Sequence, residues 1–215
     1  MNINIVFLLI QIGLISSIFS LIKLYKGERF YITFYIYIIA SYITEVITNR
    51  MINAKYFQFA NTLANSYFLL ELILLTLLIT KILGYKKINK LFLLPIIAFW
   101  VIENTLLHKI YEAEKYFNVL SAIVLFGQIS YALVINLNQN YSSFFKEANI
   151  IINLSLLLNL SFRLLFEFLY SNYDGNIHVL ELIANIYILV NFMTNILFIY
   201  CLTCIKNTKR LISSF

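Results

Sequence analysis

Proline, glycine and charge are scarce in this 215-residue chain, which has one proline, five glycines and 12% charged residues. A soluble domain normally carries about 25% charged residues, which keep its surface hydrated. The low charge, together with 61% hydrophobic residues and a mean hydropathy of +0.84, excludes an ordinary soluble fold. The scarcity of proline and glycine indicates few and short loops, because these residues punctuate secondary structure.

Cysteine and histidine, the usual ligands of structural zinc, are also few. Cys201 and Cys204 form one Cys-x-x-Cys pair, and His108 and His178 are the chain's two histidines. A lone pair of cysteines is more typical of packing than of metal binding. The histidines and nearby glutamates could form a metal or pH-sensing site, but histidines at a membrane boundary in water are the simpler interpretation. We therefore predict no metal and no cofactor.

Motifs of catalysis are absent as well. The chain has no Gly-x-Ser-x-Gly sequence, no glycine-rich phosphate loop and no histidine placed to activate a buried serine. An enzyme is therefore the least favoured class of protein, and we predict that this chain is not one.

The chain instead contains seven long apolar blocks separated by short charged clusters. Each block is long enough to cross a hydrocarbon layer of about 30 Å at about 1.5 Å per helical residue. The pattern lacks the strict alternation of a membrane barrel. We predict an all-α integral membrane protein, a seven-transmembrane helix bundle forming a single domain over residues 1–215. The expected helices cover about 4–22, 30–49, 57–80, 91–107, 116–137, 148–170 and 179–205.

The basic residues between the blocks predict the orientation. Short cytoplasmic loops of membrane proteins are enriched in lysine and arginine. With the N-terminus outside and the C-terminus cytoplasmic, eleven basic residues lie inside and four, Arg50, Lys55, Lys109 and Lys115, lie outside. The chain is thus expected in the cell membrane, as a multi-pass protein of the bacterial inner membrane. The positive charge is explained by topology, so nucleic acid is not an expected partner and the lipid bilayer is.

Ionisable residues inside the blocks resist a purely structural interpretation. They are the carboxylates Glu45, Glu71, Glu103, Glu167 and Glu181, the last near a block boundary, and the base Arg163. An ionisable group in the hydrocarbon costs at least about 2.5 kcal/mol, so it must face the interior, pair or become neutral. Counted from the helix ends, most of these residues fall in the outer half, whereas Glu71 lies near the middle of the membrane.

Amides and hydroxyls recur at helical spacing beside these groups. Stripes of this kind face neighbouring helices, where each hydrogen bond contributes about 0.6 kcal/mol. For a single asparagine or serine this packing role is the favoured interpretation. For the charged residues together, a functional site is favoured. The predicted ligand-binding set is Glu45, Glu71, Glu103, Arg163, Glu167, Asn65, Asn159, Asn185 and Asn191.

A short sequence also occurs twice. Ala-Asn-x-Tyr-x-Leu begins at Ala64 in the third block and at Ala184 in the seventh. The match is compatible with coincidence or with a parallel repeat of three helices, a linker helix and three more. That topology resembles the small sugar-transporter and cargo-receptor superfamily. The Pro-Gln motif and helix-bending prolines of that superfamily are missing, so none of its residues are assigned here.

These observations favour a membrane-embedded receptor, sensor or signalling component with an outward-leaning polar cavity for a small polar or cationic ligand. Basic inner loops suit a cytoplasmic or membrane signalling partner. The alternative is a small-solute or ion transporter, in which Glu71 would relay protons or cations. The scarcity of proline and glycine speaks against the transporter, because alternating access usually needs broken or hinged helices.

Overall fold

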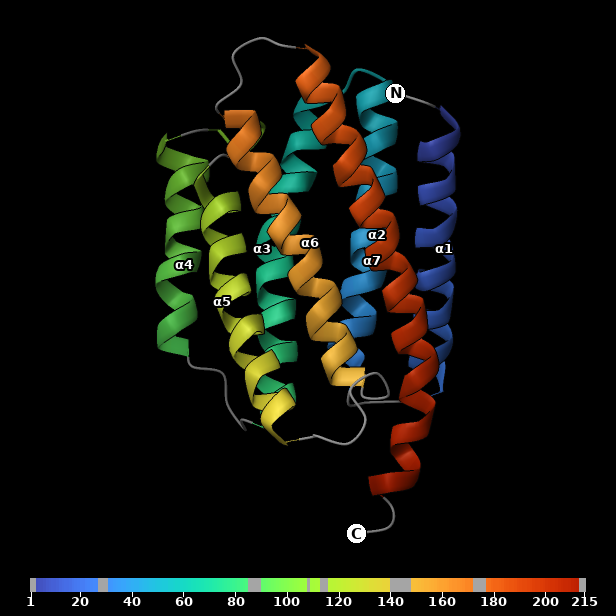
Figure 1. The fold of residues 1–215 in the computed structure, drawn as a ribbon. Coiled ribbons are helices and arrows are strands. Elements are labelled where there is room, and N and C mark those ends of the chain that lie inside the picture. Colours follow the sequence, from blue (N-terminus) through green and yellow to red (C-terminus); the bar gives the residue numbers. More distant parts are fainter. Residues whose placement is uncertain are drawn as a thin grey trace. The chain divides into compact units, whose positions relative to one another are not determined.

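The structure is a computed structural model of the chain, and it describes residues 3–26, 31–84, 90–107, 109–112, 116–139, 148–171 and 177–212. These residues form seven α-helices, which Figure 1 labels α1 to α7. The helices are α1 (Ile3–Tyr25), α2 (Ile32–Asn53), α3 (Phe57–Ile82), α4 (Lys90–Ile102), α5 (Tyr116–Gln139), α6 (Ala148–Ser171) and α7 (Ile177–Ile212). The predicted all-helical fold with seven helices is confirmed in this part of the chain.

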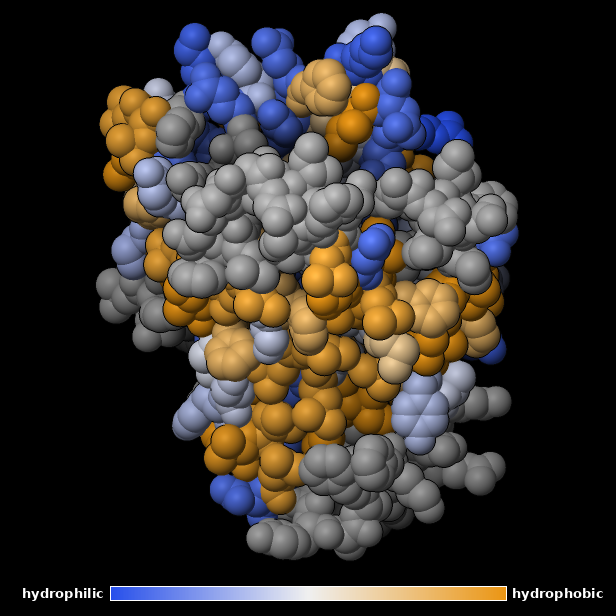
Figure 2. All heavy atoms as spheres, turned by 45° about the horizontal axis from the view of Figure 1, so that its top comes forward, coloured by the Kyte–Doolittle hydropathy of each residue, from blue (hydrophilic) through white to orange (hydrophobic). Residues whose placement is uncertain are grey.

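Five of these helices are long and apolar enough to cross a membrane. Two shorter apolar stretches, Gln11–Tyr25 and Leu93–Leu107, accompany them in the described part of the chain. The five candidate spans are Ile32–Asn53, Phe57–Ile82, Tyr116–Asn138, Ala148–Phe166 and Asn185–Ile205. Hydrophobic residues cover much of the flank seen in Figure 2. The fold is therefore that of a multi-pass membrane protein.

The helices group into two compact units. Unit 1 comprises residues 1–27 and 126–215, and unit 2 comprises residues 28–125. In unit 1, α7 packs against both α1 and α6, and in unit 2, α2 packs against α3. The first ten residues of α5 belong to unit 2 and the remainder to unit 1. The prediction of one transmembrane domain stays a prediction.

Helix α1 shows the polarity pattern of a helix in lipid. Its buried side carries Gly13, Ser16 and Ser20, whereas apolar side chains such as Ile15 and Phe19 are exposed. A helix in water would bury its apolar side. In lipid, small residues gather at helix contacts because they allow close backbone approach, and the apolar side faces the acyl chains.

Helix α4 continues into a π-helical turn, η2 (Glu103–Leu107). Two side chains in η2 bond back to the preceding turn: Asn104 Nδ2 donates to the carbonyl of Trp100 at 3.0 Å, and Thr105 Oγ1 to that of Val101 at 2.6 Å. Such bonds compete with the backbone ladder and distort it. The widened turn places Glu103 and Asn104 on the buried side of unit 2.

Candidate functional site

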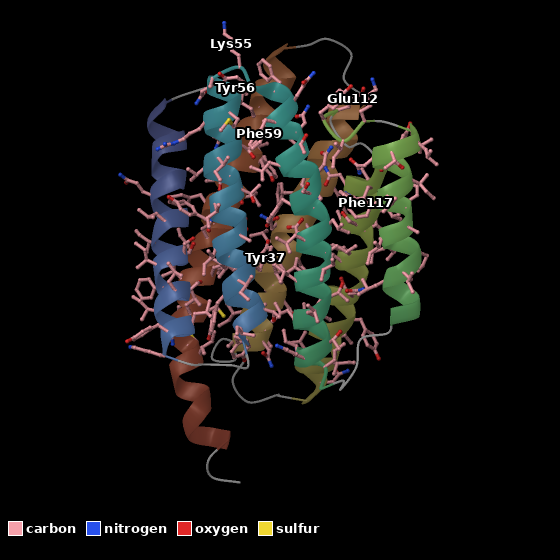
Figure 3. All side chains as sticks on the ribbon, turned by 180° about the vertical axis from the view of Figure 1, so that it is seen from behind. Tyr37, Lys55, Tyr56, Phe59, Glu112 and Phe117 are labelled. Carbon is pink, nitrogen blue, oxygen red and sulfur yellow. The ribbon has the colours of Figure 1, made fainter. Side chains whose placement is uncertain are left out.

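Glu103 is fully buried in unit 2 and binds the start of α5. Its two carboxylate oxygens accept hydrogen bonds from the backbone N–H groups of Tyr116, at 2.9 Å, and Phe117, at 2.6 Å. Figure 3 labels Phe117 at this position. The first N–H groups of a helix have no partner within the helix, and the helix dipole favours a negative charge there. Glu103 thus caps α5 from thirteen residues away, so a structural role accounts for its burial.

Asn65 on α3 clamps the segment 109–112. Its Nδ2 atom donates to the backbone carbonyls of Ile110, at 2.9 Å, and Glu112, at 2.7 Å, and lies 3.5 Å from Asn104 Oδ1. The backbone carbonyl of Asn65 accepts a bond from Trp100 Nε1 at 3.2 Å. One residue therefore joins α3, α4, η2 and the segment before α5.

Asn61, one turn before Asn65, extends this clamp by donating to the carbonyl of Tyr111 at 3.1 Å. Beside it, the Lys109 ammonium lies 5.5 Å from the centre of the Tyr111 ring. A hydrogen bond with the Tyr111 side chain raises the pKa of the exposed Lys109. Lys109 therefore keeps its positive charge at neutral pH, at the end of unit 2 where α2 joins α3.

Glu71 is a predicted site residue near the middle of α3. It is 4% exposed on α3, and Leu72 and Leu75 beside it are buried. The Tyr37 hydroxyl on α2 donates to Glu71 Oε1 at 3.5 Å, which is long for an O–H···O bond. This pairing brings a carboxyl group near the middle of one candidate membrane span together with a phenol near the start of another.

Glu45, the remaining predicted carboxylate of unit 2, is half-buried on α2. Ser41, Thr44 and Thr48 share its side of the helix and are also half-buried. The Thr48 hydroxyl has no hydrogen-bond partner although its oxygen is buried. The predicted polar stripe of α2 is therefore half-buried, on the side of the helix that also carries Tyr37.

The predicted residues of unit 1 gather on α6 and α7. Asn159 Nδ2 donates to Asn191 Oδ1 at 3.2 Å, which joins the two helices. Arg163, one turn after Asn159, is 5% exposed. Asn185, by contrast, is exposed. The side chain of Glu167 lies outside the described residues, as do those of His108, His178 and Glu181.

Unit 1 also contains polar contacts that the sequence interpretation missed. Ser16 on α1 donates to Asn195 Oδ1 on α7 at 3.3 Å, and Asn195 Nδ2 donates to the carbonyl of Asn191 at 2.9 Å. The signal was present as Gly13, Ser16 and Ser20, small residues at spacings of three and four. This chain of contacts links α1, α7 and α6 through neutral groups.

The two copies of the repeated sequence lie in different environments. Asn65 in the first copy is 2% exposed and holds several partners, whereas Asn185 in the second is exposed. The repeat therefore stays a prediction, with different roles at equivalent positions. In the described part of the chain, no group of three or more histidine, cysteine or acidic residues is placed to hold a metal.

Comparisons with known proteins give no family for this chain. No family model matches it, and no curated protein or solved structure shows significant similarity to it.

Proposed function

We propose that this chain is a seven-span membrane protein, with its N-terminus outside and its C-terminus in the cytoplasm, which acts as a receptor or sensor for a small polar or cationic ligand. The excess of basic residues in the loops assigned to the cytoplasm supports the orientation. The exposed Tyr56, Phe57, Phe59 and Tyr116 support the outer boundary, because aromatic side chains favour the membrane interface. Figure 3 shows Lys55 and Tyr56 at that end of α2 and α3.

The orientation predicts which introduced cysteines a membrane-impermeant maleimide reaches in intact cells. With Cys201 and Cys204 replaced by serine, Lys55→Cys and Glu112→Cys should be labelled from outside, because both side chains are exposed at the proposed outer end. Lys81→Cys, at the other end of α3, should be labelled only after the cells are opened. Labelling of Lys81→Cys in intact cells, with Lys55→Cys protected, would reverse the topology.

The observation that carries the receptor proposal is the buried Glu71–Tyr37 pair. Glu103 and Asn65 hold backbone groups in place, so their polarity has a structural explanation. Glu71 meets the side-chain hydroxyl of Tyr37 at 3.5 Å, in the middle of an apolar helix. A buried carboxyl group of this kind inside a membrane is a ligand-site candidate, because its placement is energetically costly.

Glu71→Gln should remove ligand binding while the fold persists. Glutamine keeps the size and an acceptor oxygen for Tyr37 but removes the charge that a cation would neutralise. We expect at least about a tenfold loss of affinity in thermal-shift titrations with ammonium, choline, Na⁺ and K⁺. Glu112→Gln, which alters an exposed acid in the same unit, is the matched control. Wild-type binding by Glu71→Gln would reject Glu71 as the ligand site.

A transporter is the second candidate, and the interruption of α4 favours it. Pro95 lies inside α4, and η2 follows directly after it. Proline and π-turns are recognised causes of helix bending, which alternating access requires. In proteoliposomes a transporter would move one of the same four cations, and Glu71→Gln would abolish the flux. A receptor would bind a cation without any flux.

A further inference from the structure

We propose that Cys201 and Cys204 on α7, together with Lys23 on α1, form a binding site for one copper(I) ion. The site lies in unit 1, at the end where α1 finishes and α6 begins, and Figure 1 shows α7 running between those two helices. It is separate from Glu71 in unit 2, so the inference goes beyond the proposed function and does not depend on it.

The two cysteines are neighbours on one side of α7. Side chains three residues apart on a helix have about 5–6 Å between their Cβ atoms, so one ion can bridge the two sulfur atoms. Cys201 is fully buried, and its Sγ donates to the backbone carbonyl of Ala148, at the start of α6, at 3.7 Å. Cys204 is half-buried, so an ion reaches the pair from the side of Cys204.

Lys23 supplies the positive charge that such a site needs. Its side chain is 8% exposed, and it lies close enough to Cys201 for an electrostatic interaction between the two groups. Two thiolates around copper(I) carry one net negative charge. A buried charge is unfavourable unless an opposite charge lies beside it. With Lys23 beside the pair, the occupied site is neutral.

Tyr200 supports the pair from outside it. Tyr200 lies one turn before Cys204 and shares a side-chain hydrogen bond with the Cys204 thiol. Partners of this kind orient metal ligands and tune the metal. The sequence alone favours packing as the role of the Cys-x-x-Cys pair, because Lys23 is far from the pair in the chain. The structure brings Lys23 to the pair, and this contact changes the interpretation.

The number and kind of ligands favour copper(I) over zinc. Soft thiolates select copper(I), zinc and iron–sulfur clusters. Structural zinc takes four protein ligands and catalytic zinc takes three. Among the described residues, no third histidine, cysteine or acidic side chain joins the pair to hold a metal. Copper(I) is stable with two thiolates, so the two cysteines complete its coordination.

Binding exchanges two protons for one metal ion. Both cysteines are free thiols. A copper–sulfur bond replaces each S–H bond, both protons pass to the solvent, and copper stays in the +1 state throughout. A bare thiolate is unfavourable in apolar surroundings, so the ion displaces the protons as it binds. No oxidant or reductant takes part.

A competition titration tests the site. The reduced protein, in detergent and free of oxygen, is titrated with copper(I) against bathocuproine disulfonate, whose copper(I) complex absorbs visible light. We expect one copper(I) ion per chain, with two sulfur neighbours in X-ray absorption at the copper edge.

Removing either thiolate should abolish tight binding. Cys201→Ala and Cys204→Ala should each weaken binding at least about a hundredfold, because even the loss of an outer partner of a metal ligand costs about 10- to 100-fold. Cys204 is half-buried, so Cys204→Ala tests the site even where Cys201→Ala disturbs the fold.

Lys23→Met and Lys26→Met are the matched pair for the charge. Both lysines lie close to the end of α1, but Lys23 is buried and Lys26 is exposed. Lys23→Met should weaken copper(I) binding about tenfold or more, whereas Lys26→Met should bind like the wild type. Equal affinities of the two variants would reject Lys23 as the charge partner.

Three results would overturn the copper(I) site. The first is a wild-type protein that takes no copper(I) from the chelator. The second is a protein without either cysteine that binds copper(I) like the wild type. The third is a disulfide between Cys201 and Cys204 in protein whose free thiols are alkylated before the cells are opened, because the pair would then be oxidised and could not bind the ion.

Discussion

Replacing Glu103 with leucine is expected to lower the free energy of unfolding by about 2–4 kcal/mol. Both carboxylate oxygens accept backbone N–H groups at the start of α5, and the site is fully buried. Leucine leaves those two donors without partners and removes the negative charge from the helix N-terminus. The measurement is unfolding in mixed micelles of increasing denaturing-detergent content, followed by circular dichroism.

Two further variants make the Glu103 test specific. Glu103→Gln retains one acceptor oxygen but turns an NH₂ group toward the other N–H. Its free energy of unfolding should therefore lie between those of the wild type and Glu103→Leu. Glu112→Gln removes an exposed acid of the same unit and should change stability by less than about 0.5 kcal/mol. Equal stability of Glu103→Leu and Glu112→Gln would show that the cap contributes nothing.

The helices could be predicted from the sequence because membrane-spanning length and apolar composition are local properties. The third helix was expected at about 57–80 and runs from Phe57 to Ile82, and the sixth was expected at about 148–170 and runs from Ala148 to Ser171. The last helix differs most from its predicted bounds, since it continues to Ile212 beyond the expected end at 205. Lysine and arginine after Ile205 are good helix formers, so the helix continues past its apolar part.

The polar site was harder to predict because its partners are backbone groups. The sequence presents Glu103 and Asn65 as buried polar side chains and favours other side chains or a ligand as their partners. In the structure they bind backbone carbonyls of Ile110 and Glu112 and backbone N–H groups of Tyr116 and Phe117, which any sequence would supply. A cap usually lies within one turn of the helix it serves. Glu103 acts from thirteen residues away, and no local pattern reveals it.

Asn65→Leu is expected to release the segment 109–112 and to lower the free energy of unfolding by about 2–4 kcal/mol. The substitution strands the carbonyls of Ile110 and Glu112, which accept the shortest bonds of the clamp. Asn65→Asp should be at least as harmful, because a carboxylate cannot donate and would face two carbonyl oxygens. The same detergent titration measures both variants.

The fluorescence of Trp100 reports locally on the effect of Asn65→Leu. It is the chain's only tryptophan, and its indole N–H donates to the backbone carbonyl of Asn65. If the 109–112 segment is released, water should enter beside Trp100 and shift the Trp100 fluorescence to longer wavelength. Asn61→Leu, which removes a single bond to Tyr111, should cost about half as much stability, since one carbonyl is stranded instead of two. An Asn65→Leu protein with wild-type fluorescence and stability would mean that the segment is held by its own packing, and Asn65 would then return to the candidate ligand-binding residues.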